Sequence, residues 1–252
     1  MANWQDPRTT SGTTGGINTA TVGVPHAARD AGLRSYMLSV YNYMASGVLL
    51  TGIIALLFAP YAGEVLLSSS GRGMSGLGWL IILSPLAIVF AMSFGMNRMR
   101  TSTLQILFWA FAALMGLSMS TLFLAYTGVS IAQTFFATAA AYLGLSLYGY
   151  TTKRDLSAMG TFFIMGVVGL LVAMLINLFL RSPGLNLAIS AIGVLIFAGL
   201  TAYDTQKIKS IYFAVAGNGE AMAKTAVMGA LNLYLDFINM FLFLLRFMGN
   251  RR

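Results

Sequence analysis

The feature that most constrains this chain is a series of long segments that carry no charge. The sequence has 252 residues but only 15 Lys or Arg and 7 Asp or Glu side chains, and most of these lie between apolar runs. A transmembrane helix needs about 20 consecutive apolar residues. Five uncharged segments reach that length, namely residues 35–63, 73–97, 101–152, 156–180 and 182–203. A sixth apolar segment, residues 225–247, is interrupted by Asp236 and closed by Arg246.

The third uncharged segment is long enough for two helices. The sequence Ala125-Tyr126-Thr127-Gly128 in its middle has turn chemistry and separates two apolar halves. Composition agrees with a membrane protein, because hydrophobic residues make up 58% of the chain and charged residues 9%, against about 25% charged in a soluble domain. Mean hydropathy is +0.78. The sequence therefore predicts an all-α, polytopic membrane protein, a bundle of seven transmembrane helices.

The N-terminal segment differs from the rest. Residues 1–30 are polar, rich in Gly, Thr and Ala, and show no helical or strand periodicity. We interpret them as a disordered cytoplasmic tail that precedes a seven-helix transmembrane domain of residues 31–252. No secretory signal is recognised, so the first helix is expected to act as the insertion signal.

Basic residues in alternate connections predict the orientation of the helices. Ten lie on the side of the N-terminus: Arg8, Arg29, Arg34, Arg98, Arg100, Lys153, Arg154, Lys207, Lys209 and Lys224. Five lie on the other side: Arg72, Arg181, Arg246, Arg251 and Arg252. Because cytoplasmic loops carry the excess of Lys and Arg, the N-terminus is expected in the cytoplasm. The net charge of +8 therefore reflects topology and a lipid bilayer as partner, and we expect no nucleic-acid partner.

Two aspartates lie where lipid disfavours charge. Asp204 directly follows the uncharged segment 182–203, the sixth predicted helix, and Asp236 lies eleven residues into the seventh predicted helix, about 16 Å along a helix that starts at residue 225. A carboxylate in the middle of a bilayer costs about 2.5 kcal/mol or more. Consecutive helices run antiparallel, so both side chains are expected in the same half of the membrane, where they can meet. Asn232 and Asn239 share a helix face with Asp236 and are possible auxiliary ligands.

The chemistry of such a pair suggests a switch. Two neighbouring carboxylates tend to hold one proton between them, whereas an adjacent Arg favours their ionised form. Arg98, and as an auxiliary Arg100, lie on the side predicted for Asp204. At higher pH both carboxylates are expected to be charged and to accept a cation, and at lower pH the shared proton and an Arg bridge close the site. The alternatives are that the aspartates only fix helix packing and that the arginines only set topology.

The last fifty residues resemble those of a known family. Tyr203-Asp204-Thr205-Gln206 follows a long apolar run, and Leu233-Tyr234-Leu235-Asp236-Phe237-Ile238-Asn239 precedes Leu244-Leu245-Arg246. These motifs are similar to those of the transmembrane Bax-inhibitor-motif family, the Bax inhibitor 1 group, and the similarity extends from about residue 35 to the C-terminus. Lys153-Arg154-Asp155-Leu156-Ser157 resembles the short basic loop between helices four and five of that family.

The resemblance implies a function as well as a fold. Family members are seven-helix proteins implicated in pH-sensitive calcium leak and, in eukaryotes, in regulation of cell death. It implies that Asp204 and Asp236 are the family's paired aspartates and that Arg98 is its latch arginine. Some bacterial relatives carry an acidic residue in helix two, but residues 81–96 have none. Ca²⁺ takes 6–8 oxygen ligands, so two carboxylates predict weak, transient binding of calcium ions, with no resident cofactor.

Other functions remain as alternatives. An intramembrane aspartyl protease also uses a Tyr-Asp pair on helix six and a second Asp on helix seven, but the Gly-x-Gly-Asp motif and the later Pro-Ala-Leu element of that class are missing. With no Cys and with His26 as the single His, thiol, rhomboid-like and His-ligated metal sites are excluded from the membrane, so we expect no enzyme activity. A third class is a membrane-embedded regulator of a membrane protease or of another membrane-protein partner. The lack of a signal peptide and the composition of the tail favour a bacterial inner membrane.

Overall fold

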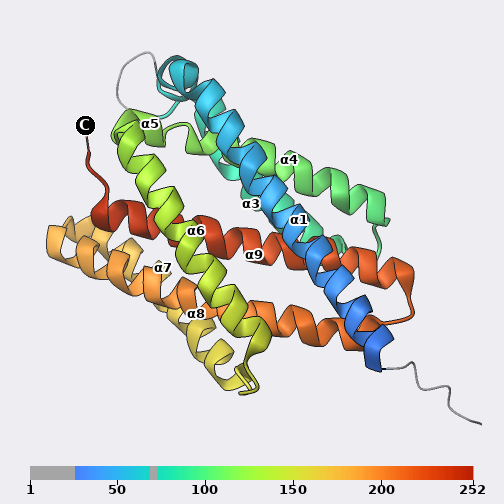
Figure 1. Cartoon of the computed structure of the whole chain (residues 1–252). Helices are drawn as coiled ribbons and strands as arrows, with labels where there is room; N and C mark the ends of the chain where they lie inside the picture. Colours follow the sequence, from blue (N-terminus) through green and yellow to red (C-terminus); the bar gives the residue numbers. More distant parts are fainter. Residues whose placement is uncertain (1–25, 69–72, 252) are drawn as a thin grey trace, which may run out of the picture.

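A computed structural model describes residues 26–68 and 73–251 of the chain (Figure 1). Its helices are, in chain order, α1 (His26–Phe58), the 3-10 turn η1 (Ala59–Tyr61), α2 (Ala62–Leu66), α3 (Gly76–Gly95), α4 (Thr101–Met119), α5 (Leu122–Ala125), α6 (Gly128–Thr151), α7 (Ser157–Leu180), α8 (Pro183–Val215) and α9 (Gly219–Met248).

The predicted all-α fold with seven candidate spans is confirmed. Within the described residues, seven helical segments are long and apolar enough to cross a membrane: Asp30–Leu66, Gly76–Gly95, Thr101–Ala125, Gly128–Thr151, Ser157–Leu180, Pro183–Val215 and Gly219–Met248. The predicted division of residues 101–152 is also confirmed, because α5 ends at Ala125 and α6 begins at Gly128. The Thr127 side chain caps α6 by accepting a hydrogen bond from the backbone N–H of Ser130.

The last helix forms the centre of the bundle. α9 packs against α1, α4, α6 and α8, whereas α3 packs mainly on α4 and α7 on α8 (Figure 1). Its buried residues include Leu231, Leu233 and Tyr234, each essentially inaccessible. The large apolar side chains of α7 are mostly exposed, as suits a helix that faces lipid on most sides. The core is therefore organised around one helix, and any group in the middle of α9 is enclosed by four others.

The turn between α8 and α9 fixes how these two helices face each other. Gly217 has φ +94°, a conformation that glycine adopts without strain. Asn218 then caps α9, because its side-chain oxygen accepts a hydrogen bond of 3.0 Å from the backbone N–H of Ala221. This short turn returns the chain directly along α8, so the two helices are antiparallel neighbours.

Both helices extend further than the apolar pattern predicted. We expected helix six to end near residue 203 and helix seven to begin near residue 225, but α8 continues to Val215 and α9 already begins at Gly219. Lysine ends an apolar run without ending a helix, because it is a good helix former with a long side chain. Lys224 even supports the first turns of α9 by an ion pair of 2.9 Å with Glu220, four residues before it.

The two ends of the described chain lie at opposite ends of the bundle (Figure 1). At the C-terminal end, the backbone N–H of Asn250 donates to Ser130 Oγ at 2.9 Å, and the Thr127 N–H donates to the Asn250 carbonyl oxygen at 3.3 Å. Residues 1–25 of the predicted disordered tail lie outside the described residues, as does Arg252. Residues 26–30, which we assigned to the tail, belong to α1.

Candidate ion-binding site

The two intramembrane aspartates lie in the core between α8 and α9. Asp236 is 17 residues after Gly219, about 26 Å along a helix whose residues rise 1.5 Å each, so it sits near the middle of α9 rather than in its early half. Asp204 is eleven residues before the end of α8. The carboxyl groups of the two side chains are within hydrogen-bonding reach of each other. The structure therefore brings the sequence-derived pair together.

The surroundings of Asp236 are unusual for a carboxyl group. Its side chain is only 4% exposed. Its Oδ2 atom is buried and has no hydrogen-bond partner among the described residues. An unsatisfied buried acceptor costs about 1–3 kcal/mol, so such atoms are rare outside functional sites. A hydrogen bond between two carboxyl groups also requires a proton on one of them. The pair can hold a proton, and Asp236 Oδ2 remains able to accept a hydrogen bond from a further donor or to bind a cation.

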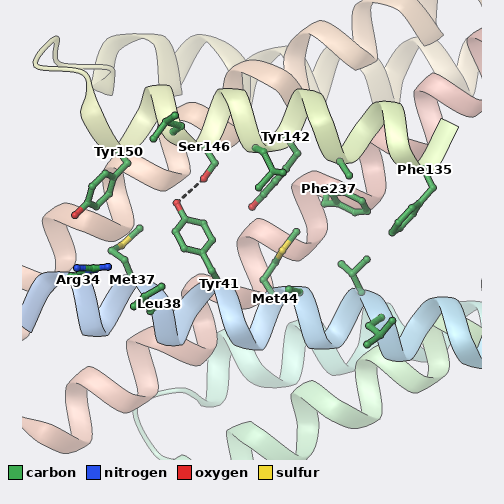
Figure 2. A pocket seen from close by; sticks show the side chains of 16 residues that line it. Arg34, Met37, Leu38, Tyr41, Met44, Phe135, Tyr142, Ser146, Tyr150 and Phe237 are labelled. Atoms are coloured by element: carbon green, nitrogen blue, oxygen red, sulfur yellow. Dashed lines mark hydrogen bonds between the residues drawn. The ribbon is translucent and has the colours of Figure 1, made fainter. Parts of the chain in front are cut away.

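A third polar group reaches the pair from α6. The Tyr142 hydroxyl is close enough for the charges of Asp236 and Asp204 to act on it, and it has no hydrogen-bond partner among the described residues. Its ring packs edge-on against Phe237, with 5.5 Å between the ring centroids (Figure 2). The Tyr142 hydroxyl of α6 therefore lies within electrostatic range of the carboxyl groups of α8 and α9.

A chain of hydroxyl groups runs beside the aspartate pair. The Tyr41 hydroxyl on α1 and Ser146 Oγ on α6 are hydrogen-bonded at 2.6 Å, and a dashed line marks this bond in Figure 2. Ser146 Oγ is in turn 3.1 Å from Thr205 Oγ1 on α8. Thr205 is adjacent to Asp204 in the sequence. The three hydroxyls therefore join α1, α6 and α8 at the level of the aspartate pair.

Sequence reasoning missed Tyr142, although the sequence holds a signal for it. Within α6, polar residues recur at every fourth position of a largely apolar helix and all are buried: Ser130, Thr134, Thr138, Tyr142 and Ser146. A four-residue period places them on one face. In a membrane such a face packs inward or lines a cavity, so the pattern could have predicted that α6 meets the aspartate pair.

Arg98 is not in contact with the pair, contrary to the predicted bridge. It lies in the turn after α3 with an exposed side chain. Within the described residues the single ion pair joins Lys224 to Glu220, so neither Asp204 nor Asp236 is bridged by an arginine. The physical reason is the position of α3, whose main neighbour is α4 and not α8 or α9. The cation whose charge acts on Asp204 is Lys207, one turn later on α8.

The other predicted auxiliary residues have modest roles. Arg100 is exposed and immediately precedes α4 without capping it by its side chain. Asn239 donates its side-chain N–H to the Leu235 carbonyl oxygen of its own helix at 2.8 Å. Asn232 is half-buried on α9. Neither asparagine is recorded in a hydrogen bond with the aspartates, so the structure does not show them as ligands.

The face of α9 that carries Asp236 packs against α8. Gly229 lies against Ile208, and Phe243 stacks on Phe197 with 5.7 Å between ring centroids. Asp236 lies between these two contacts along α9. The inward orientation of Asp236 therefore follows from the packing of α9 against α8 on both sides of it along the helix.

The donor set suits weak cation binding at most. Within the described part of the chain, no group of three or more His, Cys, Asp or Glu side chains is arranged to hold a metal ion. A divalent cation at the pair would have two carboxyl groups and would take its remaining ligands from water or hydroxyls.

The chain is similar to known proteins over most of its length. Residues 33–252 match the family described as inhibitor of apoptosis-promoting Bax1. An uncharacterized protein of Rickettsia prowazekii is 51% identical over 223 residues, covering 88% of this chain and 92% of the relative. The inner membrane protein YbhL of Escherichia coli K12 is 43% identical over 224 residues, covering 88% of this chain and 94% of that protein.

Proposed function

Because the chain belongs to the Bax inhibitor family of membrane proteins, we propose that it is a pH-sensitive leak channel that passes Ca²⁺ or a similar cation through the Asp204–Asp236 pair. The observation that supports this most is the enclosed Asp236 carboxyl, which faces Asp204 and keeps one oxygen without a partner. Intramembrane carboxyl groups that face the interior of a bundle mark ion pathways and proton relays.

Protons and cations compete for the pair in this proposal. At low pH one proton is shared between the two carboxyl groups, and the pair has little attraction for a cation. As the pH rises the proton leaves, two negative charges face each other, and a divalent cation relieves their repulsion. Flux should therefore increase with pH. The proton alone performs the closing step, since Arg98 has no contact with the pair in this conformation.

The same geometry favours passage over storage. Two carboxyl groups supply a minority of the 6–8 oxygen ligands that Ca²⁺ takes. A site with this few protein ligands binds weakly and releases its ion readily, as conduction requires. In this proposal the enclosed Asp236 corresponds to a closed state, and conduction involves movement of the helices around it.

Calcium flux into liposomes tests the proposal. Purified protein is reconstituted with an internal calcium-sensitive dye, and influx is followed across a pH series. We expect Asp204→Asn and Asp236→Asn to change both the rate and its pH dependence. Asp155→Asn is the matched control, because Asp155 lies in the exposed loop between α6 and α7, and it should behave as wild type. Equal flux in empty liposomes, wild type and both variants would refute the channel.

Two further assays separate the alternatives. A membrane-embedded protease would cleave a transmembrane peptide in the same preparation, and we expect no cleavage. A regulator of a membrane complex would co-purify with a stable partner from native membranes, and that outcome is compatible with a leak. We also propose that the protein lies in a bacterial inner membrane with its N-terminus in the cytoplasm, as the distribution of Lys and Arg favours.

A further inference from the structure

A long crevice separates α1 from α6. Each of these helices packs on α8 and α9 rather than on the other. The space between them has a volume of about 890 Å³ and continues into a second hollow of about 310 Å³. Both hollows share Val48, Leu49, Phe135 and Phe237 in their lining, so they form one groove with α9 as its floor (Figure 2). Ligand sites in proteins have volumes of about 300–1,000 Å³.

The groove opens sideways toward the acyl chains of a bilayer. Its rim is formed by Leu38 and Leu49 of α1 and by Leu143 and Leu147 of α6, and each of these side chains is more than half exposed. Exposed leucines on membrane-spanning helices face lipid. The two hydroxyls in the wall, Tyr41 and Ser146, are hydrogen-bonded to each other and need no ligand. Hydrocarbon is therefore the material that fits the length of the groove.

One end of the groove is cationic. Arg34 and Tyr150 lie together at this end, opposite Phe135 (Figure 2). Arg34 is exposed and forms no ion pair within the described residues. Lys209 donates to the Tyr150 carbonyl oxygen at 2.9 Å and lies 5.0 Å from the centroid of its ring, which leaves other protons of its ammonium group free. An apolar groove with Arg34 in its lining at one end, and Lys209 in contact with Tyr150 of that lining, is complementary to a molecule with an apolar chain and an anionic head.

We propose that this crevice is a binding site for one anionic phospholipid. An acyl chain lies along the groove over Met37, Met44 and Phe237, and the phosphate of the headgroup meets Arg34 and Lys209. Basic pockets between transmembrane helices are known to select anionic headgroups. Neutral phospholipids share the chain but lack the net charge, so the cationic end gives the site its selectivity. This inference concerns binding alone and does not depend on ion flux through the aspartates.

The test is lipid retention by the purified full-length protein, measured by native mass spectrometry during titration with phosphatidylglycerol or phosphatidylcholine. Wild type should retain one phosphatidylglycerol in preference to phosphatidylcholine. Arg34→Gln should weaken phosphatidylglycerol binding by about fivefold, the effect of one cation at a membrane surface. Arg154→Gln removes an exposed cation at the same end that does not line the groove, and it should leave affinity unchanged.

A second pair of variants tests the groove itself. Ala139 lines it, whereas Ala140 is exposed and does not. Ala139→Phe should abolish retention of both lipids, and Ala140→Phe should not, with thermal unfolding of each variant confirming that it is folded. Equal effects of the two arginine variants, equal binding of the two lipids, or full retention by folded Ala139→Phe would each overturn the proposal. So would disulfide-linked dimers of Leu143→Cys in this cysteine-free chain, because a second copy would then occupy the groove.

Discussion

Replacing Gly149 by alanine should force α6 away from α8 beside the aspartate pair. A Cβ atom at Gly149 would lie 2.2 Å from the Ala202 carbonyl oxygen and 2.9 Å from two further backbone atoms of that residue. Contacts under 3.0 Å are essentially never made by real Cβ atoms, and a backbone atom cannot rotate away as a side chain can. The two helices must therefore separate by about 0.8 Å or more at this point.

This displacement has two consequences that the structure allows us to estimate. Overpacking of a close helix contact costs about 1–3 kcal/mol in free energy of unfolding. The Ser146 Oγ to Thr205 Oγ1 distance, now 3.1 Å, would grow to about 3.9 Å and the hydrogen bond would be lost. Asp204 immediately precedes Thr205 in the sequence. The displacement should therefore affect the candidate ion site as well as the stability of the bundle.

Gly144→Ala provides the matched control. Gly144 lies on the same helix, and an added Cβ there has no atom within 4 Å. Both variants gain the same intrinsic helix propensity, about 0.8–1.0 kcal/mol, so this gain cancels when they are compared. Unfolding free energies from denaturant titration of the purified proteins in mixed micelles should then differ by about 1–3 kcal/mol, with Gly149→Ala the less stable. Equal stability of the two variants would show that α6 and α8 do not approach as closely as described.

Three other outcomes are expected. Thr51→Val removes the hydroxyl that donates to Ala112 and meets the Tyr234 hydroxyl at 2.6 Å, and it should lower the unfolding free energy by about 1–2 kcal/mol, whereas Thr51→Ser should not. Hydrogen bonds from Ser157 hold the pKa of Asp155 below its usual range. This contact is present above the unfolded pKa and is lost as pH falls through the lower folded pKa, so the protection of the Ser157 amide against exchange, relative to an unstructured peptide at the same pH, should fall only in that acidic range and not near neutrality. Alkaline phosphatase fused after the last residue should be active in a bacterial host if the C-terminus is periplasmic, and a cytoplasmic reporter should be active there if our orientation is wrong.

The seven membrane spans could be predicted from charge placement and one turn motif. Lys and Arg residues delimit the spans, and the turn at Tyr126 and Thr127 divides a segment too long for one helix. The C-terminal end of α8 and the N-terminal end of α9 could not be placed in this way. Hydropathy indicates where a helix leaves the lipid, whereas the helix itself ends where a capping residue or the backbone conformation ends it. Gly217 and Asn218 carry that second signal.

The candidate site was predictable in its chemistry and only partly in its geometry. Two carboxyl groups on consecutive antiparallel helices are placed together by topology, and this requires no knowledge of side-chain packing. Contacts between helices that are distant in sequence do not follow from topology in this way. Arg98 shares a predicted side of the membrane with Asp204, yet α4 lies between α3 and the central helices. Tyr142 shares no segment with either aspartate and still reaches both.

The central position of α9 has a consequence for how the protein is made. Chains emerge from the ribosome starting at the N-terminus, so the helix that fills the middle of this bundle is the last to appear. Until then α1, α4, α6 and α8 lack the surface on which they pack. The first six spans must remain in the bilayer as a loose assembly, and the bundle can close only after α9 has been made. Nascent chains halted before residue 219 should therefore be rapidly degraded by membrane quality control, while chains halted after α9 should already resist proteolysis.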